Sequence, residues 1–177
     1  GGDSDESTGE DSAITIGATL TPLPFVGVDA ASLTGTIFNS IAPQTVQDVV
    51  YGANGTLIAA ANGDGTISVW VNGSQRTFIG HSDVVTAVEF SPDGAFLLSG
   101  AGGADRTARL WDVSTGQTVQ FFSGHTDSIR DIAYSPTGEL VATAAEDSSI
   151  RLWNPQTGTQ VQIWLEGSRL LGVDFNH

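Results

Sequence analysis

Two stretches of the chain repeat each other, and this repeat constrains the fold more than any other feature. Residues 84–111 read VVTAVEFSPDGAFLLSGAGGADRTARLW, and residues 128–153 read SIRDIAYSPTGELVATAAEDSSIRLW. A Gly-His pair precedes each copy, at Gly80-His81 and at Gly124-His125. Self-similarity at a fixed period indicates a fold built from one repeated unit, in which each copy buries its apolar face against its neighbours.

Tryptophan marks the end of each unit. Trp70, Trp111 and Trp153 recur about every 42 residues, and a period of about 40–45 residues with a Gly-His start and a Trp-Asp end is typical of propeller blades. Inside the units, Ser91–Gly94 and Ser135–Gly138 have the composition of tight turns, because Pro presets the backbone and Gly supplies a positive φ. These turns join apolar runs of strand length, so each unit is predicted to form four short antiparallel strands.

On these motifs the chain resembles the WD-repeat β-propeller family, from about residue 36 to the C-terminus. The resemblance is strongest between Gly80 and Trp153. It implies an all-β fold of four-stranded antiparallel blades. The predicted blades cover residues 41–79, 80–122 and 123–164, and a strand at Leu170–Phe175 is expected to begin a partial fourth blade over residues 165–177.

An unfinished fourth blade leaves the ring incomplete, since propellers close with about four to eight blades. Three interpretations follow. The chain is part of a longer propeller, it closes alone with β-prone strands from residues 13–40, or another copy completes the ring. The sequence does not decide between them.

The resemblance also implies a set of four hydrogen-bonded side chains in each complete blade, here called a tetrad: a His, a hydroxyl, an Asp and a Trp. Carried over by motif, the tetrads of the second and third blades are His81, Ser99, Asp105 and Trp111, and His125, Thr143, Asp147 and Trp153. Their expected role is structural, because a network that satisfies buried polar groups makes a blade rigid.

The first blade lacks half of this set. Asp64 and Trp70 remain, but Ala42 stands at the His position and Ala60 at the hydroxyl position. A partial network leaves buried polar groups unpaired, at about 1–3 kcal/mol each. The first blade is therefore predicted to be softer than the others, or to be held by a neighbour.

A partner-binding rim is expected at the loops that carry the two histidines, where members of the resembling family commonly bind peptides or proteins. Its candidate residues are Asp83, Gly102, Gly103, Asp127, Arg130 and Asp131. The glycine pair lies in a turn that is two residues longer than its counterpart in the third blade. It could admit a partner backbone or merely absorb length.

The first 12 residues are polar and acidic, which is typical of a disordered tether. The chain begins with Gly and contains no Met, so it is predicted to be processed or trimmed. An extracytoplasmic location, periplasmic or at the cell surface, is expected on this basis, with a cytoplasmic one left open. The tether resembles the segment after the acylated cysteine of a bacterial lipoprotein, which suggests a lipid anchor upstream; a plain linker is the alternative.

The charge argues against some partners. Twenty acidic residues against six Lys and Arg give a net charge of −14, which disfavours nucleic acid and anionic membranes. No apolar stretch approaches the about 18 residues of a membrane span. No phosphate loop, zinc ligand pair or nucleophile motif appears, so we expect no catalytic residues, no metal and no cofactor.

The leading hypothesis is a non-catalytic protein-interaction scaffold that binds a protein or peptide through the rim. The alternative is a structural subunit that self-assembles into an oligomer or filament by completing its unfinished blade with strands of another copy. An enzyme is the third hypothesis, and it would require a polar cluster in the central channel.

Overall fold

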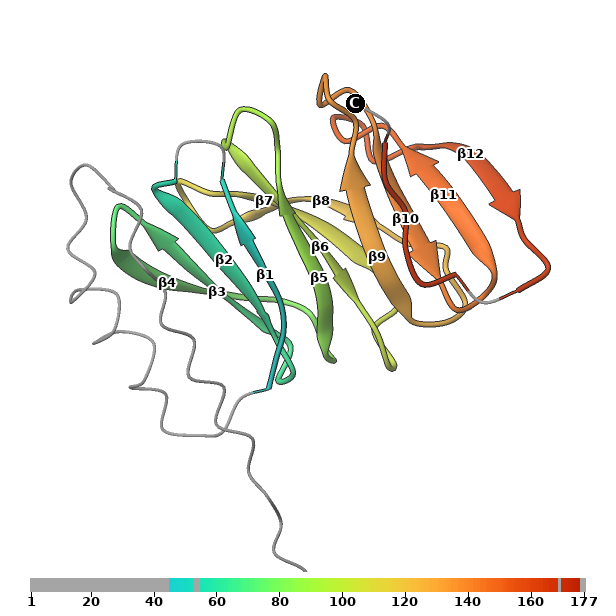
Figure 1. The fold of residues 1–177 in the computed structure, drawn as a ribbon, viewed down its shortest axis with the longest axis horizontal. Helices are drawn as coiled ribbons and strands as arrows, with labels where there is room; N and C mark the ends of the chain where they lie inside the picture. The colour runs from blue at the N-terminus through green and yellow to red at the C-terminus, as the bar shows by residue number, and fades with distance from the viewer. Residues whose placement is uncertain (1–44, 53–54, 169, 176–177) are drawn as a thin grey trace, which may run out of the picture.

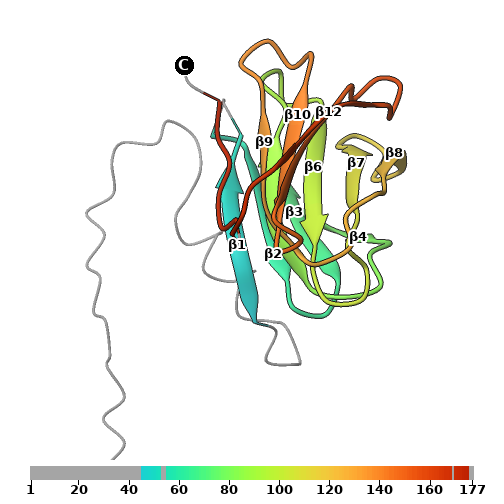
Figure 2. The same ribbon diagram turned by 90° about the vertical axis from the view of Figure 1, so that its right-hand side faces the viewer.

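The structure, a computed structural model, describes residues 45–52, 55–168 and 170–175. In this part of the chain every regular element is a β-strand, and the twelve strands form three four-stranded antiparallel sheets. The sheets stand side by side in an open row (Figures 1 and 2). The predicted all-β fold of four-stranded blades is confirmed, and the described blades leave the ring open.

The first blade pairs its strands in the order β1-β2-β3-β4, and the second in the order β5-β6-β7-β8. The strands of the first blade are β1 (Val46–Tyr51), β2 (Leu57–Asn62), β3 (Thr66–Val71) and β4 (Ser74–Ile79). Those of the second are β5 (Val85–Phe90), β6 (Phe96–Ala101), β7 (Ala108–Asp112) and β8 (Thr118–Phe122).

The third blade repeats the same order, with β9 innermost and β12 at the outer edge. Its strands are β9 (Ile129–Tyr134), β10 (Val141–Ala145), β11 (Ser149–Trp153) and β12 (Gln160–Leu165). The cross-strand register recurs: Ile58 pairs with Trp70, Leu97 with Trp111, and Val141 with Trp153. This common register gives equivalent positions in the three blades.

The Ser-Pro-x-Gly turns form as the sequence predicts. Gly94 and Gly138 have φ of 72° and 74°, in the left-handed region that L-residues other than Gly rarely adopt. In the first of them the Ser91 hydroxyl donates to Asp93, and the backbone N–H of Phe96 donates to the Ser91 hydroxyl. Both turns lie at the end of the blades opposite to the two histidines, and this end is called the turn face below.

Neighbouring blades pack through two apolar clusters. One joins the first and second blades around Ile67, Val85 and Trp111, and the other joins the second and third around Leu98, Ile129 and Trp153. Since burial of apolar surface contributes about 25 cal/mol per Å², these clusters are the main source of stability. Each blade thus needs a neighbour to bury its inner face.

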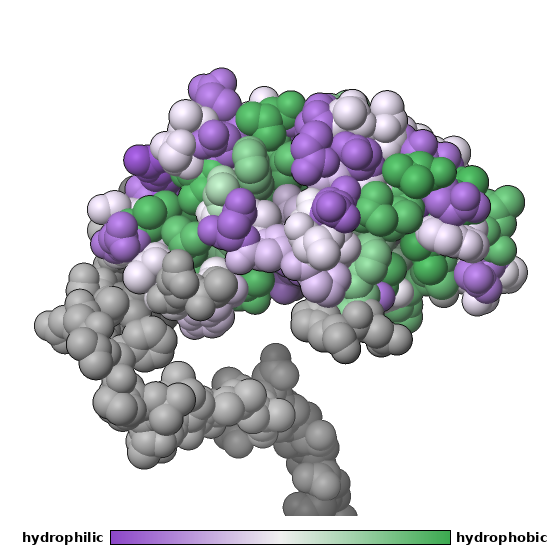
Figure 3. All heavy atoms as spheres, turned by 90° about the horizontal axis from the view of Figure 1, so that it is seen from above, coloured by the Kyte–Doolittle hydropathy of each residue, from purple (hydrophilic) through white to green (hydrophobic). Residues whose placement is uncertain are grey.

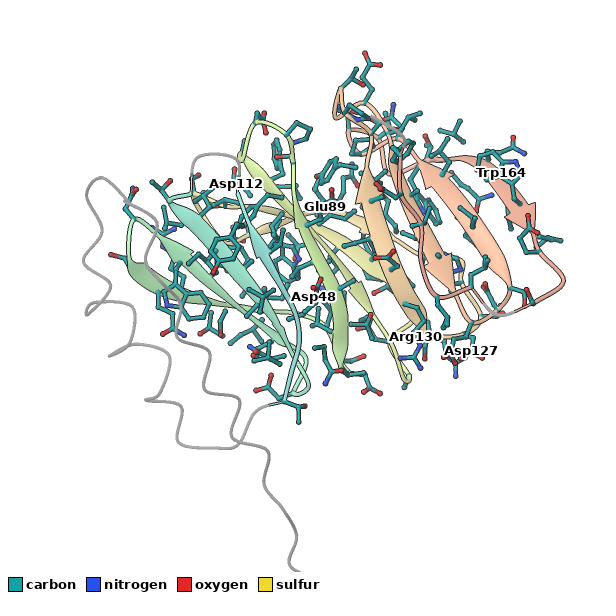
Figure 4. The ribbon with its side chains drawn as sticks, in the orientation of Figure 1. Asp48, Glu89, Asp112, Asp127, Arg130 and Trp164 are labelled. Atoms are coloured by element: carbon teal, nitrogen blue, oxygen red, sulfur yellow. The ribbon has the colours of Figure 1, made fainter. Side chains whose placement is uncertain are left out.

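Side chains of the innermost strands also bond the next blade. Asp48 of β1 accepts from the backbone N–H of Val88 at 3.0 Å, and Glu89 of β5 accepts from that of Tyr134 at 2.9 Å (Figure 4). These bonds satisfy backbone groups of the innermost strands that have no further strand to pair with. They fix how one blade sits beside the next.

The predicted innermost strand of a fourth blade is not formed, because residues 170–175 contain no β-strand. The segment nevertheless runs beside β9, where the N–H of Val173 donates to Asp131 at 2.8 Å. A strand requires a ladder partner, and the segment has none among the described residues. The tether over residues 1–12 and the β-prone residues 13–40 lie outside the described part of the chain.

Candidate functional site

The tetrad residues of the second blade come from four different places in the chain and meet inside the blade. His81 lies in the loop between β4 and β5, Ser99 on β6, Asp105 in the turn after β6, and Trp111 on β7. The His81 ring contacts the Asp105 carboxylate through Nδ1 at 3.1 Å and the Ser99 hydroxyl through Nε2 at 2.7 Å. The Trp111 indole Nε1–H donates to the same hydroxyl at 2.8 Å.

The third blade brings together the equivalent four side chains in the same geometry. His125 Nδ1 lies 2.9 Å from Asp147, and its Nε2 lies 2.7 Å from the Thr143 hydroxyl. The Trp153 indole donates to this hydroxyl at 3.0 Å. Both hydroxyls are fully buried, so each network satisfies groups that water cannot reach.

The direction of the hydrogen bonds follows from the chemistry of the carboxylate. An ionised Asp only accepts, so Nδ1 of the neutral imidazole carries the proton and Nε2 accepts from the hydroxyl. The hydroxyl in turn accepts from the indole. Burial lowers the pKa of His125 despite the opposing effect of Asp147, so this ring is neutral at pH 7.

The two aspartates are ionised even though they are partly buried. Burial works to raise the pKa of Asp105, but donors from His81, Thr107 and Ser82 outweigh it and hold that pKa well below its usual range. For Asp147 the same balance lowers the pKa to about 2. The carboxylates also accept from the backbone N–H of Ser82 and of Thr126, so each tetrad anchors the loop that follows its histidine.

The Ser99, His81 and Asp105 side chains share their hydrogen-bond order with a hydrolase triad, but their surroundings differ. A nucleophilic hydroxyl needs open space for a substrate and an oxyanion site beside it. The Ser99 hydroxyl is fully buried and already receives the indole N–H of Trp111. The arrangement therefore supports a structural network and gives no route for acyl transfer.

The glycine pair of the predicted rim lies against the chain itself. The Gly103 N–H donates to the Ser128 hydroxyl of the third blade at 3.0 Å, and the next N–H, of Ala104, donates to Asp83 at 2.8 Å. A Cβ at Gly103 would meet the Asp83 carboxylate, so only glycine fits there. The longer turn thus connects two neighbouring blades.

The other rim residues divide into two groups. Asp127 accepts from the Ser128 N–H at 2.7 Å, and the partly exposed Arg130 side chain donates to Glu146 at 2.6 Å, at the end of the blades shown in Figure 4. Asp131 lies deeper on β9, where its carboxylate accepts from the N–H groups of Ile132 and Val173. Asp131 therefore faces the segment 170–175, away from the exposed loops.

One residue at the rim was not singled out by the sequence. Arg106 donates to the carbonyl of Gly103 and, across to the third blade, to the carbonyl of Thr126 at 3.0 Å. It does so with a φ of 58°, which is uncommon for a residue with a Cβ. Its position in a turn that is two residues longer than its counterpart in the third blade was the signal available.

Other kinds of site find no support in the described residues. Within residues 45–52, 55–168 and 170–175, no three His, Cys, Asp or Glu side chains gather in a way that could hold a metal ion. No helix in that same part of the chain is long and apolar enough to cross a membrane.

The fold and the two tetrads define a class of protein, that of β-propeller blades built from repeats. The repeat pattern of the family "WD domain, G-beta repeat" matches residues 33–71, 72–112 and 116–154. The chain belongs to this family. Membership implies a protein-interaction scaffold, and such scaffolds are typically non-catalytic.

Relatives of known name are also WD-repeat proteins. Nuclear distribution protein PAC1 of Arthroderma otae is 34% identical over 123 residues, which cover 63% of this chain and 27% of the relative. Eukaryotic translation initiation factor 3 subunit I of Neosartorya fischeri is 33% identical over 97 residues, covering 55% of this chain and 28% of the relative. The chain thus spans about a quarter of the length of the relatives it matches.

These relatives correct the predicted location. The sequence suggested an extracytoplasmic protein, but the relatives are named for nuclear distribution and for translation initiation, both of which take place inside cells. The prediction of an extracytoplasmic location is wrong. It relied on the missing Met and the acidic start, and neither feature reports an export route. The lipoprotein interpretation depended on the same location and is withdrawn with it.

Proposed function

We propose that the chain is a non-catalytic scaffold that binds a protein or peptide at the rim, with the two tetrads in a structural role. The observation that carries the proposal is how the rim loops are held. Asp105 and Asp147 fix the loops after the two histidines, while Arg106 and Gly103 join the second blade to the third. A surface held in this way loses little conformational entropy on binding.

The charge of the chain supports a protein partner rather than nucleic acid. At −14 the chain repels phosphate backbones and attracts basic surfaces. Asp127 and Arg130 lie at the exposed rim, so their side chains can distinguish one partner protein from another.

The test compares captured proteins between variants. The chain is immobilised and exposed to an extract of the cells that make it, alongside the double variant Asp127→Ala and Arg130→Ala and the control Ser74→Ala at the exposed start of β4. We expect at least one protein to bind the wild-type chain and the control but to be lost from the rim variant. Retention of every captured protein by the rim variant would contradict rim binding.

A second candidate, self-assembly through the open sides of the row, has one observation in its favour. Large apolar side chains are exposed on the first and the last blade, including Tyr51 of β1 at 66% and Trp164 of β12 at 45% (Figure 4). Exposed apolar surface of this kind marks contact with another element or chain.

Sedimentation velocity of the purified chain tests this candidate. Self-assembly predicts dimers or larger particles that dissociate when Trp164 is changed to Ser, while the exposed turn variant Thr157→Ala leaves them intact. A monomer at high micromolar concentration would exclude it.

A further inference from the structure

A half-open cavity of about 610 Å³ lies between the second and third blades on the turn face. Pro92, Phe96 and Leu110 line it from the second blade, and Tyr134 and Pro155 line it from the third. Figure 3 views the molecule from this side, where apolar and polar residues alternate. The volume falls within the about 300–1,000 Å³ of typical ligand sites.

The equivalent place between the first and second blades is packed with apolar side chains. There Phe90 and Val113 are buried in one core cluster, with Leu57 and Val71 packed against it. By register, Phe90 corresponds to Tyr134 of the next pair of blades, and Val113 corresponds to Pro155. Leu57 corresponds in the same way to Phe96, and Val71 to Asp112. Two of the four apolar positions have therefore become polar, at Tyr134 and Asp112, where the cavity lies.

Tyr134 presents an unpaired hydroxyl at this cavity. The residue is 5% exposed, and its hydroxyl has no hydrogen-bond partner in the described structure. Burial, with Glu89 and Asp93 nearby, raises the pKa of the Tyr134 phenol well above its usual value, so the group stays a neutral donor. Native proteins pair nearly all such buried groups, so this hydroxyl indicates a missing partner.

Two carboxylates give the cavity a negative charge. Asp93 and Asp112 both line it, and Oδ1 of each carboxylate accepts hydrogen bonds from its own turn. The hydroxyls of Ser91 and Ser114 are the main cause that lowers the pKa of each carboxyl, so both are ionised at pH 7. The salt bridges of the described residues lie elsewhere, at His81, His125 and Arg130.

We propose that this half-open cavity, called the groove from here on, binds a short linear peptide of a partner protein, in which a bulky apolar residue stands next to Lys or Arg. The apolar side chain lies between Leu110 and Pro155, a peptide carbonyl accepts from the Tyr134 hydroxyl, and the basic side chain reaches Asp112. A second copy of the chain is a poor occupant, because two chains of net charge −14 repel each other.

This site goes beyond the rim proposal, since it lies at the opposite end of the blades. In Figure 4, Asp112 lies near the upper end of the sheets, whereas Asp127 and Arg130 lie at the lower end. A failure of rim binding would leave this groove in place, and the reverse holds as well.

The probe is a phage-displayed library of random dodecapeptides selected on the whole chain. We expect the selected peptides to carry Lys or Arg beside Leu, Ile, Phe or Trp. The strongest is then synthesised with a fluorescent label and titrated by polarisation. Tyr134→Phe should weaken its Kd about fivefold, as expected for loss of one hydrogen bond, and leave the Tm unchanged or higher.

Asp112→Asn should also weaken binding and make it less sensitive to salt, because it removes one charge and keeps an acceptor for the turn. Asp174→Asn, exposed in the segment after the third blade and outside both proposed sites, is the matched control and should bind as the wild type does. The proposal is overturned if no peptide is selected, or if selected peptides bind Tyr134→Phe and Asp112→Asn as tightly as the wild-type chain. It is equally overturned if the chain sediments as a dimer that Asp112→Asn dissociates, since the occupant would then be a second copy.

Discussion

The first and second blades have the same register, but they differ in the hydrogen bonding of the equivalent tryptophan. In the second blade the indole N–H of Trp111 donates to Ser99, whereas the buried indole N–H of Trp70 has no hydrogen-bond partner among the described residues. Ala60 occupies the position of Ser99 and lacks the hydroxyl. The blade geometry therefore does not require the tetrad.

The first blade uses a smaller network instead. The Asn62 side-chain amide donates to the hydroxyls of Thr66 and Ser68, and the Thr66 hydroxyl donates to Asp64 at 2.7 Å. This set stays at the end of the sheet and does not reach Trp70. Strand register therefore sets the shape of a blade, while the buried network sets how firmly that shape is held.

The largest effect is expected from removing the shared hydroxyl of the second blade. Ser99→Ala leaves both Trp111 Nε1 and His81 Nε2 buried without a partner, so the free energy of unfolding should fall by about 2–5 kcal/mol. Urea denaturation measures it. Ser74→Ala, at the exposed start of β4, is the control and should change stability by less than about 0.5 kcal/mol. Equal effects of the two variants would show that the tetrad contributes nothing.

The aspartate in the turn after the second strand allows a direct comparison of the two networks, because both blades have one. Asp105→Asn places an amide where the carboxylate accepts from His81, Ser82 and Thr107, and should cost about 2 kcal/mol. Asp64→Asn in the first blade disturbs a turn but no tetrad, so about 1 kcal/mol or less is expected. Thermal unfolding of both variants provides the measurement, and a larger loss for Asp64→Asn would reverse the ranking of the two networks.

The pH dependence should also separate the blades, since the third blade contains His125 and no His lies between residues 45 and 79. Burial holds the pKa of His125 below its usual 6.5, so the folded chain binds this proton less readily than the unfolded chain. The contribution of His125 to the free energy of unfolding is therefore fully present above pH 6.5 and declines as the pH falls below it. We expect the Tm to drop between pH 7.5 and 5.5, and His125→Gln to lower the Tm at pH 7.5 and reduce that drop. A Tm that rises on acidification would contradict this sign.

The smallest change in stability, and the only increase, is expected in the first blade. Ala60→Ser supplies the missing acceptor for the indole of Trp70 and should raise the free energy of unfolding by about 0.5–1 kcal/mol. Ala61→Ser, one residue away on the same strand, adds a hydroxyl on the other face and should destabilise the chain. A loss of stability in Ala60→Ser would mean that the indole already has a partner.

Much of the fold could be predicted from the sequence because the repeat itself carries the register. Trp70, Trp111 and Trp153 occur at equivalent strand positions, and each of the three units forms the four antiparallel strands that the motifs predict. The expected strand at 170–175 failed for a physical reason. The pattern reports which residues favour a strand, but a ladder also needs a partner strand.

The site was less visible from the sequence. The tetrad members could be chosen by position within the repeat, whereas Arg106 and the groove at Tyr134 could not. Their signals are differences between repeats, such as Tyr134 against Phe90, and such differences have no meaning until the register places them at a shared cavity. Asp131 was expected near the rim for a similar reason, since strand periodicity does not show how deep a side chain lies.

Backbone hydrogen exchange, resolved by peptide, is the most direct test of the difference between the blades. The account predicts that amides of β6 (Phe96–Ala101) and β10 (Val141–Ala145) exchange more slowly than those of β2 (Leu57–Asn62), although all three are the second strand of their blade. Ser99→Ala should bring β6 to the rate of β2. Equal protection of the three strands in the wild-type chain, or stronger protection of β2, would contradict the claim that the complete tetrads make the second and third blades the firmer ones.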